Sequence, residues 1–321
     1  MLKTLGLAAL LIATVLSSQK YVTYIDKINQ WWPPAAIAEG IAVPSFATDN
    51  QYNVINLAFL LSDKPADIAL IWSDPLLYFG STDCPFGQTK AQIQANLTSF
   101  YHQANTKILV SAFGATEFPT TEGRDPVETG TKLAQFVKEN DLDGIDLDWE
   151  DNAAMENGTG EQWLIDCVKA IRKILPVGEY LLTHAPQAPY FIGKPRYPNG
   201  AYVTVHQEVG HLIDWYNIQF YNQGSSGYNS YEELFIESTG SFPGTAVKNI
   251  IEKGVPQEKV VIGKPVTSGD AANTGWVDPT SLGEWAARAK QEFGWDAGIM
   301  TWQYPSDVGG KYVTSYKAGL T

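Results

Sequence analysis

Cysteine is scarce in this sequence, and its scarcity excludes one class of fold. Only Cys84 and Cys167 occur among 321 residues, too few for a scaffold built on disulfide bonds. The sequence leaves open whether the two form one disulfide or remain separate thiols. No group of cysteines and histidines has the spacing of a zinc site, so we expect no metal and no other cofactor.

Positive charge is also in short supply. Lys and Arg number 22 against 35 Asp and Glu, which gives a formal net charge of -13. Such a chain repels polyanions, so we expect no nucleic-acid partner and no membrane partner. A neutral polymer is a better candidate, and the 10 Trp, 16 Tyr and 13 Phe offer aromatic faces of the kind that stack on sugar rings.

Long apolar runs are absent after the N-terminus. Residues 1–18 place Lys3 before an apolar run that ends in small residues, which is the pattern of a cleaved secretory signal. No later segment approaches the roughly 18 apolar residues of a membrane span. We therefore predict a signal peptide at 1–18 and a secreted, extracellular, monomeric chain at 19–321. Asn96 and Asn157 begin sequons that this compartment allows to be glycosylated.

Short apolar runs rich in β-branched and aromatic residues recur along the rest of the chain, as strands do. There are eight, at 21–25, 54–60, 107–113, 144–149, 180–185, 215–221, 259–266 and 297–303. Amphipathic helical stripes separate several of them, for example Leu164, Cys167, Val168 and Ile171 after the fourth run. Buried strands alternating with helices indicate an α/β fold with a parallel sheet.

Eight repeats favour closure into a single (β/α)8 TIM barrel, with a doubly wound open sheet as the alternative. No linker rich in Pro or Ser divides residues 19–321, so we expect one domain. Residues 267–296 leave room for one helix between the last two runs, and no room for an inserted α+β subdomain.

The segment 143–150 reads DGIDLDWE and ends the fourth run. Because strand side chains alternate, Asp146, Asp148 and Glu150 point one way and the apolar residues between them the other. Three carboxyls about 6–7 Å apart cannot all ionise cheaply in a narrow site, so at least one pKa should rise. Glu150 would lie at the barrel mouth, where a protonated carboxyl can serve a glycosidic oxygen, and Asp148 is placed to hold or share its proton.

Two other interpretations of this segment are weaker. A calcium-binding loop that began at Asp146 would need Gly at its sixth position, where Asp151 stands. A solvated acidic turn would not interleave large apolar residues with its charges.

The segment DGIDLDWE resembles the DxxDxDxE signature of family 18 glycoside hydrolases, the chitinases and endo-β-N-acetylglucosaminidases. Further segments extend the resemblance across nearly the whole mature chain, especially to small single-domain members such as the class III plant chitinases. They are Asn56–Phe59 for the family's second strand, Ala185–Gln187 for the fifth, Gln219–Asn222 for the sixth and Met300–Trp302 for the eighth.

The resemblance implies a role for each matching residue. Glu150 would be the acid/base, Asp148 would orient the substrate N-acetyl group, Asp146 would tune Asp148, and Tyr221 would hydrogen-bond the acetamido oxygen. Trp302 would form the apolar floor under the sugar. The remaining substrate-binding residues would be Gln219, Phe59, Gln187, Met300, Tyr24 and Asn222. For Phe59, Gln219, Tyr221 and Trp302, ordinary core packing is the competing interpretation.

The same resemblance implies that the acetamido group of the substrate is the nucleophile. The reaction then passes through an oxazolinium intermediate and retains configuration, without a second carboxylate nucleophile. The expected function is a secreted endo-acting chitinase. The alternatives are an endo-β-N-acetylglucosaminidase acting on N-glycans and a non-catalytic chitin-binding barrel lectin.

The sequence departs from the family pattern at two positions. Phe113 stands where the family's third-strand motif SxGG has a glycine, which is expected to add bulk close to the carboxyls. His184 replaces an apolar residue on the fifth strand. It is either a hydrogen-bonded packing residue or a titratable group near the acids.

Overall fold

The computed structural model describes residues 19–27, 52–74, 89–224 and 227–321. The predicted signal peptide at 1–18 and Cys84 lie outside these residues. Cys167 is a buried thiol on the helix α8 (Gly160–Ile174).

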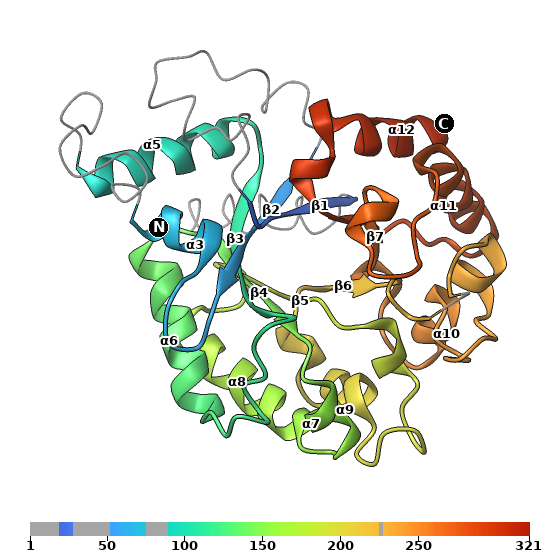
Figure 1. The fold of residues 1–321 in the computed structure, drawn as a ribbon, viewed down its shortest axis with the longest axis horizontal. Coiled ribbons are helices and arrows are strands. Elements are labelled where there is room, and N and C mark those ends of the chain that lie inside the picture. Colours follow the sequence, from blue (N-terminus) through green and yellow to red (C-terminus); the bar gives the residue numbers. More distant parts are fainter. Residues whose placement is uncertain (1–18, 28–51, 75–88, 225–226) are drawn as a thin grey trace, which may run out of the picture.

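Eight parallel strands close into one barrel, in which each strand pairs with the next and the last pairs with the first (Figure 1). Each coincides with one of the apolar runs, so the predicted (β/α)8 barrel is confirmed. The strands are β1 (Lys20–Ile25), β2 (Val54–Leu60), β3 (Lys107–Gly114), β4 (Gly144–Trp149), β5 (Leu181–His184), β6 (Trp215–Gln219), β7 (Val260–Pro265) and β8 (Gly298–Trp302).

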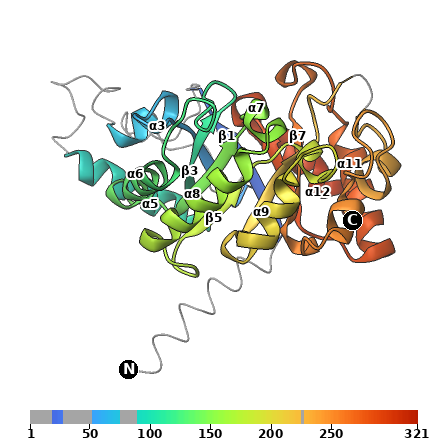
Figure 2. The same ribbon diagram turned by 90° about the horizontal axis from the view of Figure 1, so that it is seen from below.

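Helices cover the outside of the barrel (Figures 1 and 2). Besides α8 they are α3 (Asp67–Ser73), α5 (Lys90–Gln103), α6 (Pro126–Glu139), α7 (Asn152–Glu156), α9 (Ala201–Val209), α10 (Val247–Glu252), α11 (Pro279–Phe293) and α12 (Lys311–Gly319). Short 3-10 turns lie at Ala188–Phe191, Gly210–Leu212, Gln257–Lys259, Ser268–Asp270, Tyr304–Ser306 and Val308–Gly310, and a π-helical turn at Glu232–Ile236. The stripe predicted for α8 is its buried face.

The connection from β7 to β8 contains the single α-helix α11, as the short spacing predicts. Asp278 caps its N-terminus by accepting a hydrogen bond from the Ser281 amide at 3.0 Å, and Pro279 occupies the first turn. Gly294 ends the helix in the left-handed conformation at φ 82°. The barrel therefore carries no inserted subdomain at this position.

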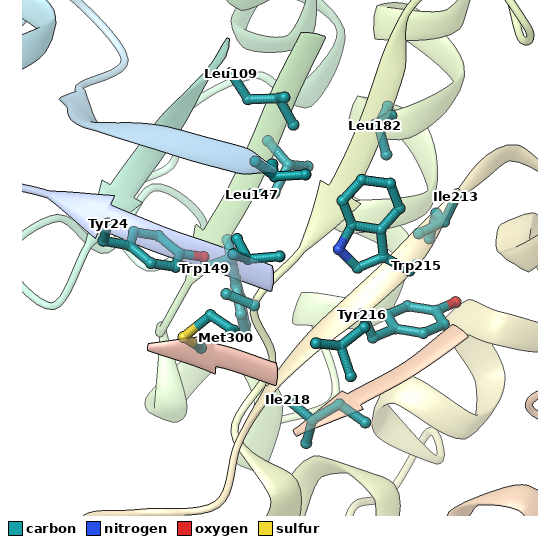
Figure 3. Packing of buried hydrophobic residues seen from close by; sticks show 14 of the residues in the cluster. Tyr24, Leu109, Leu147, Trp149, Leu182, Ile213, Trp215, Tyr216, Ile218 and Met300 are labelled. Carbon is teal, nitrogen blue, oxygen red and sulfur yellow. The ribbon is translucent and has the colours of Figure 1, made fainter. Parts of the chain in front are cut away.

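Apolar side chains inside the barrel and between strands and helices form one core. Figure 3 shows part of this packing, including Leu147, Trp149, Trp215 and Ile218. Among the described residues, every helix is too short or too polar to cross a bilayer. The closed sheet thus provides a rigid frame whose strand ends hold the polar residues described next.

Candidate active site

Strand β4 directs its acids into the barrel and its apolar residues into the helix layer. Asp146 bonds to side chains from other strands, whereas Leu147 is fully buried and Trp149 Nε1 donates to Thr120 Oγ1 at 3.2 Å. Glu150 follows the last strand residue and is half-buried. The alternation predicted from the sequence is confirmed, and Glu150 marks the C-terminal end of the barrel, where sites form in this fold.

Asp146 is enclosed by hydrogen-bond donors. Tyr24 Oη (2.7 Å) and Ser111 Oγ (2.9 Å) donate to Oδ2, and Thr183 Oγ1 (2.6 Å) and Asn217 Nδ2 (3.0 Å) donate to Oδ1. Burial raises the pKa of Asp146, and these donors oppose the rise because they stabilise the ionised carboxylate. The carboxylate is therefore held in one orientation by four other strands.

Three of those donors, Ser111, Thr183 and Asn217, were not predicted from the sequence. A signal for two of them exists in the strand register, because Ser111 and Thr183 are the direct neighbours of Asp146 on β3 and β5. Polar residues at one level of adjacent barrel strands meet in the lumen. Without the register, they look like ordinary polar interruptions of apolar runs.

Gln219 joins the two outer acids. Its Nε2 donates to Asp148 Oδ1 at 2.8 Å, to Glu150 Oε1 at 3.0 Å and to the Ala185 carbonyl at 2.9 Å. Gln187 Nε2 donates to the other Glu150 oxygen at 3.2 Å. Both glutamines therefore hydrogen-bond to the acids, and their contact with substrate stays a prediction.

The electrostatics of the acids centre on Asp148. Burial raises its pKa well above the usual range, and the charges of Glu150 and Asp146 and a hydrogen bond to Glu150 raise it further. The predicted rise of at least one carboxyl pKa is confirmed at this residue. A proton on Asp148 removes its repulsion with the charges of Glu150 and Asp146 and can be donated in the hydrogen bond to Glu150.

Aromatic residues surround the acids. Tyr221, two residues beyond β6, is 6% exposed, and burial followed by the charges of Asp148 and Glu150 raises its pKa. Its phenol therefore keeps its proton and can donate a hydrogen bond. The Trp302 ring centroid lies 5.8 Å from that of Tyr24 and 6.1 Å from that of Phe59, which brings the ends of β1, β2 and β8 together.

Two other predicted residues show no hydrogen bond to the acids among the described contacts. Met300 is buried two residues before Trp302 on β8 (Figure 3). Asn222 Oδ1 accepts hydrogen bonds from the amides of Ala272 and Asn273, at 2.7 and 3.4 Å. Asn222 thus ties the end of β6 to the loop after β7, and its contact with substrate stays a prediction.

Phe113 does not crowd the carboxyls, contrary to expectation. Alternation from Ser111 would point it into the barrel, but its backbone adopts φ 79°, a conformation that bulky residues rarely occupy. The ring instead packs edge-on against Trp163 of α8, with centroids 5.8 Å apart. The next residue, Gly114, also has positive φ and leaves space for Phe59, whose ring would lie 2.9 Å from an added Cβ.

His184 also lies away from the acids. It pairs with Leu147 on the helix-facing side of the sheet, and its Nδ1 is 3.0 Å from Tyr202 Oη. Burial, helped by the charge of Arg172, lowers the pKa of His184 to about 3. The packing interpretation is therefore confirmed, and the alternative of a titratable group near the acids is excluded.

Known proteins with similar sequences and folds include several glycosidases. Endochitinase 3 of Metarhizium robertsii is 26% identical over 323 residues, covering 92% of this chain and 91% of its own length. The crystal structure of a GH18 chitinase from Pseudoalteromonas aurantia has a TM-score of 0.70 and 28% identity, over 94% of this chain and 100% of that one. A fungal endo-beta-N-acetylglucosaminidase has a TM-score of 0.64 over 94% and 99% of the chains, and at 19% identity it shows the shared fold alone.

A family model matches almost the entire described chain. Residues 20–318 match the glycosyl hydrolases family 18, and the match includes the acids on β4 and every aromatic residue placed around them. The chain therefore belongs to glycosyl hydrolase family 18 and is a glycoside hydrolase.

Proposed function

We propose that this protein is a secreted, retaining endo-glycosidase that hydrolyses β-1,4 N-acetylglucosamine linkages in chitin. One observation carries the proposal. Gln219 holds Asp148 and Glu150 through one amide nitrogen, beside a buried Tyr221 whose phenol keeps its proton. This is an acid pair with a hydrogen-bond donor for an amide oxygen close by.

The first step uses Glu150 as the acid. Its carboxyl gives a proton to the glycosidic oxygen while the acetamido oxygen of the same substrate attacks the anomeric carbon. The bond to the leaving sugar breaks, and an oxazolinium ion forms. Asp148, deprotonated at that moment, accepts the acetamido N–H and stabilises the positive charge.

The second step reverses the role of Glu150. The carboxylate takes a proton from water, the water oxygen attacks the anomeric carbon, and the ring of the oxazolinium ion opens. Two inversions at one carbon give net retention. The raised pKa of Asp148 supports proton exchange between the two acids during the cycle.

Tyr221 and Trp302 position the reacting sugar in this scheme. The Tyr221 hydroxyl donates to the acetamido oxygen and aims it at the anomeric carbon. The Trp302 ring, held against Tyr24 and Phe59, gives the apolar face of the sugar a floor. A sugar without the 2-acetamido group brings no nucleophile, so it should not be cleaved.

The similar endochitinase and chitinase support chitin as the substrate, and the apolar N-terminal segment supports secretion. The test incubates purified protein with a β-1,4 N-acetylglucosamine hexamer and, separately, with a high-mannose glycoprotein. Shortened hexamer and intact glycans support the proposal. Released glycans with intact hexamer indicate an endo-β-N-acetylglucosaminidase, and no cleavage of either substrate indicates a chitin-binding barrel.

A further inference from the structure

Lys264 on β7 is a fully buried lysine with an unusual set of partners. Its Nζ donates to the backbone carbonyls of Phe220, at 2.9 Å, and Tyr228, at 2.8 Å. Burial lowers the pKa of Lys264 to about 7, and no ion pair with a described carboxylate balances its charge. Burying an amine without such a partner costs free energy. The two hydrogen bonds to the Phe220 and Tyr228 carbonyls are what Lys264 contributes to the structure in return.

The strand ladder explains why the Phe220 carbonyl needs this donor. The Phe220 amide donates to the Gly263 carbonyl at 3.2 Å, which continues the parallel pairing of Gln219 with Gly263. In a parallel ladder, the Phe220 carbonyl would then accept from the amide of residue 265. Residue 265 is proline and has no N–H. The Lys264 side chain supplies the hydrogen bond that Pro265 cannot.

The peptide unit fixed in this way leads directly into Tyr221. Gly275 also approaches this segment so closely that an added Cβ would lie 2.3 Å from Tyr221 Cβ and 3.1 Å from the Phe220 carbonyl oxygen. The Asn222 amide also donates to the Thr274 carbonyl at 2.8 Å. The backbone on both sides of Tyr221 is thus held by Lys264 of β7 and by the loop after β7.

We infer that Lys264 is a positioning residue for Tyr221. By donating hydrogen bonds to the Phe220 and Tyr228 carbonyls, Lys264 fixes the backbone that places Tyr221 beside the acids. The inference rests on the proposed role of Tyr221 in orienting the acetamido oxygen. A neutral amine keeps two N–H groups, one for each carbonyl, so both hydrogen bonds can form whether Lys264 is protonated or not.

The test compares Lys264→Met, which keeps the length of the side chain and removes the donors, with the parent on the N-acetylglucosamine hexamer. We expect kcat to fall about 10- to 100-fold with little change in KM, because the aim of the nucleophile is lost while the sugar contacts remain. The matched control is Lys259→Met. Lys259 Nζ also donates to two carbonyls, those of Gly210 and Ile213, outside the site, and its loss should leave kcat unchanged.

A double variant separates positioning from general stability. If Lys264 acts through Tyr221, Lys264→Met should add nothing to the loss caused by Tyr221→Phe. Multiplied losses in the double variant, or a parent-like kcat in Lys264→Met, would overturn the inference and leave the proposed function intact. A parent-like kcat in Tyr221→Phe would instead refute the role of Tyr221 itself.

Restoring the backbone donor provides the rescue. Pro265→Ala returns an N–H to the ladder, so Lys264→Met/Pro265→Ala should be folded and should regain part of the lost kcat. This pair also tests the inference if Lys264→Met alone does not fold. A folded double variant with no more activity than Lys264→Met, or one that is unfolded like the single variant, would count against the inference.

Discussion

Among the three acids on β4, Glu150 is the most exposed and the only one beyond the end of the strand. Its partners, Gln187 and Gln219, donate through neutral amides, so they orient the carboxyl without adding charge. A general acid needs this combination of a fixed direction and access to the substrate.

Glu150→Gln preserves the shape of the side chain and removes the transferable proton. We expect kcat on the N-acetylglucosamine hexamer to fall by about 10²- to 10⁴-fold, while the Kd for the hexamer, measured by calorimetry, stays close to the parent value. Turnover at the parental rate would remove Glu150 from the mechanism.

Asp148→Asn tests the electrostatics through stability. The pKa of Asp148 is raised in the folded protein above the value of about 3.9 that it has in the unfolded chain. The folded state therefore gains its full stability from protonated Asp148 below that value. It loses this stability as the pH rises through the folded pKa. Asparagine has no such loss. The variant should therefore be more stable than the parent near pH 7, by about 1.4 kcal/mol for each unit of pKa rise, and the gain should vanish toward pH 4.

Urea unfolding of both proteins across this pH range measures the difference, and Asp141→Asn on the exposed surface serves as the control. A difference that does not depend on pH, or that grows toward acid, would contradict the assignment. Activity should fall in the same variant by about 10²-fold or more, because the oxazolinium charge loses its partner.

The sequence was sufficient to identify the acids, and not all of the side chains that donate hydrogen bonds to them. Asp146, Asp148 and Glu150 follow from period-two alternation in one short segment. The donors Ser111 and Asn217 come from strands far away in the sequence, and only the register brings them to Asp146.

At the scale of elements, the loop between β7 and α11 presses against the end of β6. Gly275 has φ 118°, and an added Cβ would lie 2.3 Å from Tyr221 Cβ. We expect Gly275→Ala to displace Tyr221, to lower kcat about 10-fold or more and to reduce the free energy of unfolding by about 1–3 kcal/mol.

Gly178→Ala is the matched control, because Gly178 has φ 85° and no atom near an added Cβ. It should lose only the roughly 1–2 kcal/mol of the left-handed backbone and keep the parental kcat. Equal kcat values in the two variants, measured on the hexamer, would show that the loop does not hold Tyr221.

Strands and long helices were predictable because their signals are local. Apolar runs gave all eight strands, and the stripe on α8 matches its buried face. The end of β3 was not predictable, because the positive φ of Phe113 breaks the alternation that places every other side chain on that strand. Trp163, which receives the ring, lies on a separate helix.

At the scale of the whole molecule, the fully described connection between β7 and β8 contains a single α-helix and adds no wall to the site on that side. We expect such a site to bind chains along their length and to cut them internally. The hexamer should yield mainly dimer, trimer and tetramer at early times, as chromatography would measure. Monomer as the main early product from long chitin would contradict endo action.

The closed barrel itself was predictable from the count and rhythm of its repeats, and the contacts between the aromatic residues at its mouth were not. Phe59, Trp302 and Tyr24 meet only because β8 pairs with β1 and β1 with β2. A sequence gives the members of such a group, and barrel closure makes them neighbours.

The stereochemistry of the first product tests the central claim most directly. Time-resolved proton NMR of hexamer hydrolysis reports the anomer formed at each new reducing end before mutarotation. If the acetamido group of the substrate is the nucleophile, the configuration is retained, and the β-anomer should appear first. An initial α-anomer would mean direct attack by water, and the account of this site would be wrong.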